Sequence, residues 1–424
     1  MLCAGRQILK NTTILICGAG IAGPALAYWL RQYGFEPTLI ERAPALRSGG
    51  YIVDFWGRGF DVAERMGLLP GLRRAGYDID EVRIVDGRGK RSGGFGVHTL
   101  RPAIGGYVSI LRSDLSRLIY EALDGGVRTI FGDTIRAIEQ DEAGVRVSFE
   151  HAPDERFDLV IGAGGLHSPV RSLVFGPEER YEKYLGYYAA SFSAGGYPHQ
   201  DQNAYVSYAA PGRQVSRYAL RDNRTAFFFV FASDTKLSIG PRDLHAQKSL
   251  LRERFGRDDW ECPEILAALE PSSDLYFDPV SQIRMDRWSN GRVALLGDAC
   301  FCPSLLAGQG SALAMTGAYI LAGELAQSQG DHKAAFANYE KFFHPFIARK
   351  QRAEERFAGA FAPKSQTGVF IRNQVTRLMA LPFVSKLAMG RLLIDRLTLP
   401  AYDLAPGRPP HHSRTPRPRP SQLH

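Results

Sequence analysis

The chain has 424 residues, of which 45% are hydrophobic, and carries a formal net charge of +8. This length and apolar content allow two or three domains with a large buried core. The charge is spread along the chain without dense Lys/Arg clusters, which argues against a nucleic-acid-binding protein. Five cysteines are too few for a disulfide framework, and no residues with metal-ligand spacing occur. We therefore expect a cytoplasmic protein without a metal site.

The first long apolar stretch, residues 12–30, has two possible interpretations. Its sequence, TTILICGAGIAGPALAYWL, is long enough to suggest a signal peptide or a membrane-spanning helix. Three glycines and one proline interrupt it, however, and a polar sequence follows directly. The nucleotide-binding interpretation explains these glycines, so we expect no stable membrane insertion.

The same stretch begins a strand–helix–strand pattern. Residues 12–17 predict a buried strand, residues 22–33 a helix, and residues 36–41 a second strand that ends in Glu41. Such a βαβ unit starts a parallel sheet with helices on its faces.

Three glycines of this unit match the dinucleotide-binding pattern G-x-G-x-x-G. Gly18 permits the tight turn, Gly20 lets the backbone approach a pyrophosphate, and Gly23 lets helix and strand pack closely. The helix N-terminus offers free N–H donors and partial positive charge to phosphate oxygens. Glu41 is placed to accept hydrogen bonds from ribose hydroxyls and disfavours a 2′-phosphate. The motif therefore predicts bound FAD or NAD rather than NADP.

The rest of the chain shows two kinds of pattern. Strands and helices alternate up to about residue 180 and again from about residue 286. Between them, strands joined by Gly, Pro and Asn turns predict an antiparallel sheet: residues 187–193, 204–209, 214–220 and 225–232. Long helices are expected at 309–327 and 333–350, followed by a basic amphipathic helical region at 373–397. The Pro- and Arg-rich end is expected to be disordered.

A second glycine-rich segment follows the β-rich region. In residues 291–299, GRVALLGDA, an apolar strand delivers Asp298 at a turn, and residues 307–311, AGQGS, lead into a helix. Here the chain resembles the group A flavoprotein monooxygenases, the family of para-hydroxybenzoate hydroxylase, and most closely its tetracycline-inactivating branch. The resemblance implies that Asp298 hydrogen-bonds the ribityl chain of FAD. It also implies that the backbone of Gly308 and Gly310 meets the flavin, where a helix N-terminus stabilises negative charge.

Two shorter segments extend this resemblance, which covers about residues 12–350. Residues 41–44, ERAP, match the ribose-binding segment of the family and place Arg42 near the adenosine. Residues 110–115, ILRSDL, match the segment whose arginine touches FAD, so Arg112 is assigned to the cofactor. The alternative for Arg112 is an ordinary surface arginine at the start of a helix, with Ser113 or Asp114 as the cap.

The chain departs from the family at one position. Gly164 stands where the family has an aspartate that is associated with the flavin and the reductant. How the nicotinamide is engaged is therefore open, and we expect no second nicotinamide-binding fold. His167 and Arg171 follow in the same segment, either as ligands of the reductant or, as we favour, as structural parts of the turn and next helix.

Together these features predict an α/β fold with a Rossmann-like FAD-binding domain built from discontinuous segments. A mainly antiparallel β-sheet substrate domain is inserted into it, and C-terminal helices follow. The expected boundaries are 11–74, 101–180 and 286–345 for the FAD-binding domain, 75–100 and 181–285 for the substrate domain, 346–403 for the C-terminal helices and 404–424 for a disordered tail.

Candidate substrate residues come from the expected antiparallel sheet. Side chains of a strand alternate between its two faces. In the aromatic run at residues 227–231, one set, including Phe229, is therefore expected to line the substrate cavity and the other to pack in the core. Arg213 and Arg217 on the neighbouring strand are candidates for steering an anionic or phenolate substrate, with a solvated strand face as the alternative.

The resemblance implies an FAD-dependent monooxygenase that hydroxylates or otherwise oxygenates an aromatic or polyketide-like small molecule. NADPH or NADH would reduce the flavin, and O₂ would give the C4a-hydroperoxide that transfers one oxygen atom. The flavin supplies the bond chemistry, so no catalytic side chain is expected. The expected partners are the small-molecule substrate and O₂. Two alternatives stay open: an FAD-dependent dehydrogenase or reductase without oxygen insertion, and a cofactor-binding protein without turnover.

Overall fold

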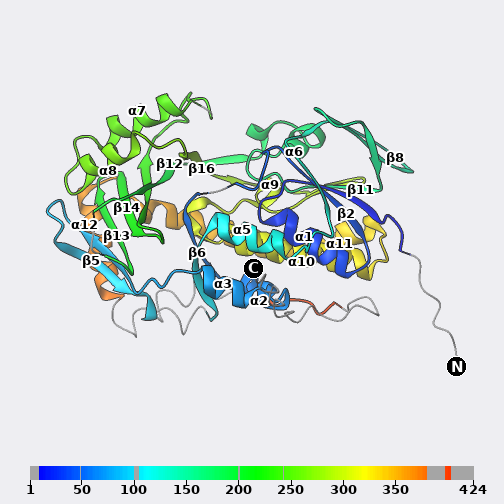
Figure 1. The fold of residues 1–424 in the computed structure, drawn as a ribbon, viewed down its shortest axis with the longest axis horizontal. Coiled ribbons are helices and arrows are strands. Elements are labelled where there is room, and N and C mark those ends of the chain that lie inside the picture. The colour runs from blue at the N-terminus through cyan, green and yellow to red at the C-terminus, as the bar shows by residue number, and fades with distance from the viewer. Residues whose placement is uncertain are drawn as a thin grey trace, which may run out of the picture.

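The computed structural model describes residues 9–47, 49–99, 105–198, 201–241, 243–379 and 397–402. Two lobes lie side by side, one built on a parallel sheet and the other on a mainly antiparallel sheet (Figure 1). The predicted fold class, α/β with an added antiparallel sheet and C-terminal helices, is confirmed. The tail expected at residues 404–424 lies outside the described residues.

The first lobe is built on a six-stranded sheet with the order β17-β18-β11-β1-β2-β7. All neighbouring strands run parallel except β17 and β18. The strands are β1 (Thr13–Cys17), β2 (Glu36–Glu41), β7 (Arg128–Phe131), β11 (Leu159–Gly162), β17 (Ser289–Asn290) and β18 (Val293–Leu295). The three central strands β1, β11 and β18 are almost completely buried, as expected for a sheet covered on both faces.

Two layers cover this sheet (Figure 1). One consists of the helices α1 (Ala22–Gln32), α5 (Arg112–Glu121), α10 (Gly310–Gln327) and α11 (His332–Phe361). The other consists of α6 (Pro169–Val174) and the small sheet of β8 (Ile135–Asp141), β9 (Gly144–Phe149) and β10 (Glu155–Phe157). The lobe is completed by α2 (Arg58–Arg65), α3 (Leu69–Ala75), α9 (Asp298–Phe301) and the antiparallel pair β3 (Ile52–Trp56) and β6 (Tyr107–Leu111).

The second lobe is built on a seven-stranded sheet with the order β16-β12-β15-β14-β13-β4-β5. Only β13 and β4 pair in parallel. The strands are β4 (Glu81–Val85), β5 (Arg91–Gly96), β12 (Glu182–Gly195), β13 (Ala204–Ala210), β14 (Arg213–Ala219), β15 (Arg224–Ala232) and β16 (Tyr276–Ile283). Helices α7 (Leu244–Phe255) and α8 (Cys262–Leu269) cover one face, and α12 (Gln366–Leu378) packs against β5.

Strand register divides the side chains of this sheet between two faces. On the outer face, Phe227, Phe229 and Phe231 pack against Phe255 and its neighbours in α7 and α8. The inner face is the opposite one, and Tyr218 on it accepts a hydrogen bond from Ile52 N of the first lobe at 2.7 Å. The other inner-face side chains used below are Tyr205, Ser207, Gln214, Ser216, Phe228, Val230, Tyr276 and Asp278. The inner face is therefore the one turned toward the first lobe.

Two helix boundaries differ from those expected. Helix α5 begins at Arg112, and neither Ser113 nor Asp114 caps it, because the extended residue before the helix is Leu111, which has no side-chain acceptor. Helix α12 begins at Gln366, seven residues before the expected start, because Ser365 caps it by accepting from Gly368 N at 3.1 Å. The rest of the helical region expected at 373–397 includes residues 380–396, which lie outside the described residues.

Within the described ranges, no helix combines the length and apolar character needed to cross a membrane.

Candidate functional site: a dinucleotide cleft facing an aromatic wall

The turn after β1 is closed by backbone contacts that require glycine. Gly18 has a φ of +115°, and its N–H donates to the carbonyl of Ile40 at 2.7 Å. A Cβ on Gly18 would lie 2.5 Å from the carbonyl oxygen of Ala163, and one on Gly23 would overlap the carbonyl oxygen of Gly18. Gly20 differs, because a Cβ there would meet only the Arg112 side chain at 3.8 Å. Gly18 and Gly23 thus fix the turn, while Gly20 keeps its outer side open.

The helix that follows this turn has an N-terminus suited to an anion. Helix α1 has no side-chain cap at Ile21 and no acidic residue in its first turn. Its first N–H groups therefore remain available to phosphate oxygens, which the partial positive charge of the helix end also attracts. Such an open helix end beside Gly20 fits a pyrophosphate.

Glu41 lies beside the glycine turn at the end of β2. Its carboxylate accepts from Ala19 N at 2.9 Å and from Ala43 N at 3.0 Å. Burial, together with the nearby charge of Glu41, raises the pKa of the Cys17 thiol to about 12, and the charge of Arg42 opposes this rise. Both charged residues therefore lie near the end of β1, where the ribose of a dinucleotide held by the turn would be.

The second glycine-rich segment folds back onto the first. Gly297 has a φ of +69° and starts the turn that delivers Asp298 at the beginning of α9. A Cβ on Gly310 would lie 3.6 Å from Asp298 Oδ1, and one on Gly308, where φ is +66°, would meet no described atom within 4 Å. The backbone around Gly308 and Gly310 therefore leaves space beside the Asp298 carboxylate.

Arg112 joins the two glycine-rich segments. It stands at the junction of β6 and α5, with its Nη2 atom next to Gly20. Burial raises the pKa of Asp298, and the positive charge of nearby Arg112 opposes this rise. The structure thus brings together residues that are separated by about 280 positions, and all the predicted cofactor residues lie along one edge of the parallel sheet.

An aromatic wall begins next to Arg112. The Arg112 N–H donates to the carbonyl of Tyr51 at 3.1 Å. The Tyr51 ring lies 5.3 Å from the Tyr276 ring and 6.2 Å from that of Phe228, between ring centroids. Burial raises the pKa of the Tyr51 hydroxyl to about 12, so it stays protonated. The sequence, with Gly49 and Gly50 next to Tyr51, predicts that Tyr51 lies beside the flavin. Tyr276 was not predicted because it belongs to no motif, and the alternation of residues 227–231 led to Phe229 rather than to Phe228.

The structure corrects the expected substrate role of Arg213, Arg217 and Phe229. All three lie on the outer face, turned away from the cofactor residues. Arg213 Nε donates to Asp258 at 2.8 Å, and Arg217 Nε donates to Glu261 at 2.6 Å. These guanidinium groups are neutralised by carboxylates of the segment that joins α7 and α8. The phenylalanines alternate as expected, but the inner set is the one that faces the first lobe.

Gly164 and the residues that follow it pack as a structural turn. A Cβ on Gly164 would lie 3.0 Å from Pro169 Cδ, which leaves little space for an aspartate. Arg171 is completely buried and donates to Ala299 O at 3.0 Å and to Glu178 at 2.6 Å. These contacts support the structural interpretation of Arg171, which fastens the turn to the residue after Asp298.

His167 connects the two lobes and provides a pH-dependent prediction. It lies 3.0 Å from Glu178 and 3.1 Å from Asp278 of β16, and these hydrogen bonds raise its pKa to about 10. A raised pKa stabilises the fold fully below the unfolded value of about 6.5, and this stabilisation is lost as pH rises toward 10. His167 is about half exposed, so His167→Gln should lower stability by only about 1 kcal/mol near pH 6.

Urea unfolding from pH 6 to pH 10 measures this effect. The difference in free energy of unfolding between the parent and His167→Gln should be largest at pH 6 and should disappear toward pH 10. His245→Gln, at an exposed position of α7, is the control. A gap that is constant across the range would show that the charge of His167 contributes nothing.

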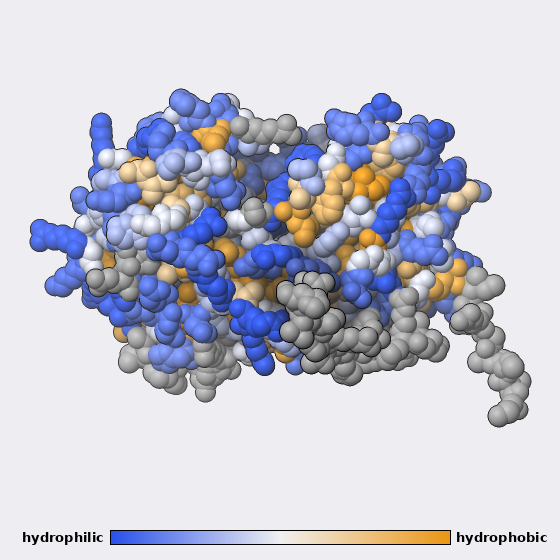
Figure 2. All heavy atoms as spheres, viewed as in Figure 1, coloured by the Kyte–Doolittle hydropathy of each residue, from blue (hydrophilic) through white to orange (hydrophobic). Residues whose placement is uncertain are grey.

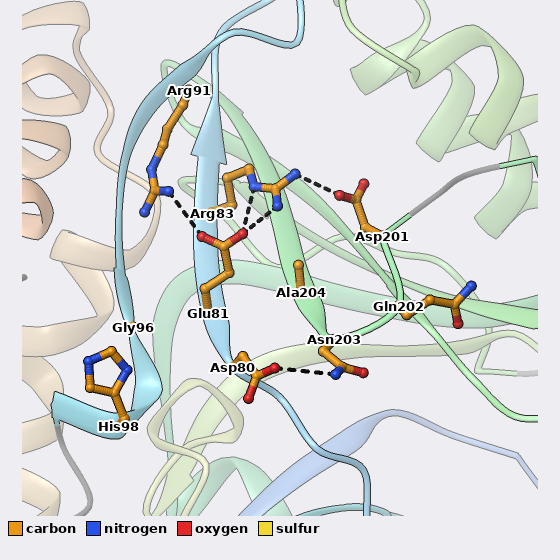
Figure 3. A pocket seen from close by; sticks show the side chains of 10 residues that line it. All are labelled: Asp80, Glu81, Arg83, Arg91, Gly96, His98, Asp201, Gln202, Asn203 and Ala204. Carbon is orange, nitrogen blue, oxygen red and sulfur yellow. Dashed lines mark hydrogen bonds and ion pairs between the residues drawn. The ribbon is translucent and has the colours of Figure 1, made fainter.

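Figure 3 shows a pocket on the second lobe, and none of the predicted cofactor residues lines it. It is lined by charged residues of β4, β5 and the segment before β13, and most of these charges are paired with each other. Arg83 pairs with Glu81 and Asp201, and Arg91 pairs with Glu81. By register Arg83 shares the outer face with Arg217. Because its charges are already paired and it is remote from the glycine turns, this pocket is not the cofactor site.

The geometry is that of a dinucleotide-binding α/β protein, because phosphate donors and a ribose acceptor lie where the strands of the parallel sheet end. Residues 11–349 match the FAD binding domain family, and the chain belongs to that family. Several proteins, some with solved structures, are similar to it. A flavin-dependent monooxygenase of Legionella longbeachae is 34% identical, with 93% of this chain and 99% of the relative covered.

Two further relatives come from different sources. The FAD-dependent monooxygenase asL6 of Sarocladium schorii is 33% identical, with 90% of this chain and 94% of the relative covered. The crystal structure of the tetracycline destructase Tet(55) superposes with a TM-score of 0.80 at 33% identity, with 92% and 99% covered. The predicted FAD cofactor, the predicted class of FAD-dependent monooxygenase and the resemblance to the tetracycline-inactivating branch are thereby confirmed.

Proposed function

We propose that this protein uses NAD(P)H and O₂ to insert one oxygen atom into a small aromatic or polyketide-like molecule bound against the inner face. The observation that carries the proposal is the position of Tyr51, Phe228 and Tyr276 beside Arg112. An aromatic surface in this position offers offset-stacked and edge-to-face contacts to a planar substrate. The names of the relatives, one of which is a tetracycline destructase, support the same substrate class.

We further propose how the chain would hold the cofactor. Gly18, Gly20 and the start of α1 would hold the pyrophosphate, and Glu41 with Arg42 would hold the adenosine half. Asp298 and Arg112 would hold the ribityl side, with Gly308 and Gly310 against the flavin ring. This proposal keeps the expected domain boundaries. It also keeps the expected location of the protein in the cytoplasm, where NAD(P)H is supplied.

When bound, FAD supplies the redox chemistry and the activation of O₂. The chain would contribute orientation, through the aromatic rings of the inner face, and exclusion of water from the space between the lobes. The two lobes are separated by a notch at the upper edge of the molecule (Figure 2). The Tyr51 hydroxyl, kept protonated by burial, would act as a hydrogen-bond donor to the substrate.

The proposal is tested by oxygen labelling with the purified, FAD-loaded protein. Tetracycline and a series of hydroxynaphthoates are offered with NADPH or NADH under ¹⁸O₂. We expect one ¹⁸O atom in the product of an accepted compound. We also expect that compound to accelerate NAD(P)H oxidation about tenfold or more, because substrate favours a state that is a minor one in its absence.

Two results would contradict the proposal. Rapid NAD(P)H oxidation without any compound, together with unlabelled products, would indicate a dehydrogenase or reductase. Label that enters only hydrogen peroxide or water with every compound would show that oxygen is not inserted.

A further inference from the structure

A positively charged side chain reaches the inner face from the C-terminal helix. Arg372 belongs to α12, which packs on the inner side of β5: a Cβ on Gly93 would lie 2.7 Å from Thr376 Oγ1 of this helix. Gly93 is the register partner of Ile84, which is the neighbour of Ser207 on the inner face. From this position of α12, Arg372 Nη1 donates to Gln214 Oε1 on the inner face at 2.7 Å.

The partners of Arg372 are all neutral. Its Nη1 atom also donates to the carbonyl of Phe361 at 3.1 Å, and its Nε and Nη2 atoms donate to Asn373 Oδ1 at 3.2 and 2.9 Å. No carboxylate of the described residues pairs with it. Burial alone lowers the pKa of the Arg372 guanidinium to about 10. Arg213 and Arg217 of the same lobe, by contrast, have the carboxylate partners given above.

A half-buried cation without a counter-charge is unfavourable in the free protein, because its desolvation is not offset by an ion pair. The neutral acceptors fix the guanidinium in one orientation, and no carboxylate in the part of the chain that the structure describes compensates its charge. The four hydrogen bonds of the Arg372 guanidinium use the Nε–H, both N–H groups of Nη1 and one N–H of Nη2. The second N–H of Nη2 therefore remains for a ligand. An anion bound there would supply the missing charge.

The inner face continues from Arg372 to the aromatic wall. Gln214 is the register partner of Val230 on β15, and Ser216 is that of Phe228. Ser216 and Ser207 share a hydrogen bond of 2.8 Å, and Tyr205 stacks on Tyr218, so polar and aromatic groups alternate along this face, where Ser207, Ser216 and Tyr218 are buried. Diagonal neighbours across strands are about 7–8 Å apart, so Arg372 and Phe228 are separated by more than the width of one aromatic ring along this face.

We propose that Arg372 is a specificity-determining residue that binds an ionised oxygen of the substrate, at the end remote from Arg112 and Asp298. The substrate class is therefore a fused-ring molecule with a carboxylate, enolate or phenolate group. This inference rests on the proposed function, because it takes the inner face as the substrate surface. It adds the charge of the substrate and the residue that recognises it.

Equilibrium dialysis of the FAD-loaded protein tests the proposal without turnover. The probes are 1-hydroxy-2-naphthoate and its neutral amide, which differ in charge but hardly in shape. The parent should bind the acid about tenfold or more tightly than the amide, as expected for a charge-assisted hydrogen bond. Arg372→Gln should remove this preference, and Arg372→Lys should retain part of it.

Two further variants separate recognition from structure. Gln214→Glu leaves Arg372 in place but gives it an internal carboxylate, so the acid preference should also disappear. This variant keeps the test decisive even where Arg372→Gln fails to fold. Arg377→Gln removes the same charge from an exposed position of the same helix and should keep the preference.

A parent that binds neither probe, or binds both equally, would overturn the proposal. So would an acid preference that survives in Arg372→Gln or in Gln214→Glu. Failure of the proposed function is a separate result, because a protein that prefers the acid through Arg372 but incorporates no ¹⁸O would retain the anion site and lose only the oxygenation.

Discussion

Gly23→Ala should abolish FAD binding and destabilise the whole first lobe. The added Cβ would overlap the carbonyl oxygen of Gly18, a residue that is held in place by the hydrogen bond from its N–H to Ile40 of β2. Either α1 or the turn must then move, and both belong to the buried core. Overpacking of this kind typically lowers the free energy of unfolding by about 1–3 kcal/mol or more. Thermal unfolding of the apoprotein and flavin absorbance of the purified protein measure the two effects.

Gly20→Ala is the matched comparison for this variant. Its Cβ would have only the Arg112 side chain near it, at 3.8 Å, and its backbone needs no positive φ. The apoprotein should therefore unfold like the parent, while FAD binding falls because the methyl group occupies the side that the pyrophosphate approaches. If Gly20→Ala and the parent bound FAD with equal affinity, the pyrophosphate would not bind at this turn. Normal stability of Gly23→Ala would show that the turn is not rigid.

Gly18 and Gly23 show why the glycine turn could be predicted from the sequence. A turn that needs a positive φ and two close backbone approaches leaves a short, local pattern of glycines. Glu41 could be placed because it ends a strand of predictable length. Arg112, Asp298, Gly308 and Gly310 are far apart in the sequence, and there the resemblance to a known family supplied what local patterns lack.

The residues that face the substrate could be predicted only in part from the sequence. Alternation along a strand separates the residues of two faces, but it does not say which face meets the cofactor. That choice depends on α7 and α8, which cover the outer face and enclose Arg213, Arg217 and Phe229. The position of Arg372 could not be predicted for a similar reason, since it follows from the packing of α12 against β5, in which Gly93 meets Thr376, 283 residues further along the chain.

Asp298→Ala should weaken FAD binding about 10- to 100-fold. The side chain lies beside the space left by Gly308 and Gly310, where it would accept one or two hydrogen bonds from the ribityl hydroxyls. Each such bond to a charged group contributes about 1.5–3 kcal/mol. Removal of the carboxylate also leaves the charge of Arg112 without the group that now interacts with it. Fluorescence titration of the apoprotein with FAD measures the loss.

Asp298→Asn distinguishes the charge from the shape of this side chain. The amide retains one acceptor of the same size but carries no charge opposite Arg112, so its FAD affinity should fall between those of the parent and Asp298→Ala.

Riboflavin, which lacks the AMP half and the phosphates, should lose affinity by a similar factor in Asp298→Ala, because the contact is to the ribityl side. In Gly20→Ala, riboflavin binding should be unaffected, because the pyrophosphate contact is absent from the ligand. An Asp298→Ala protein that loses FAD but binds riboflavin like the parent would place Asp298 at the phosphates rather than at the ribityl chain.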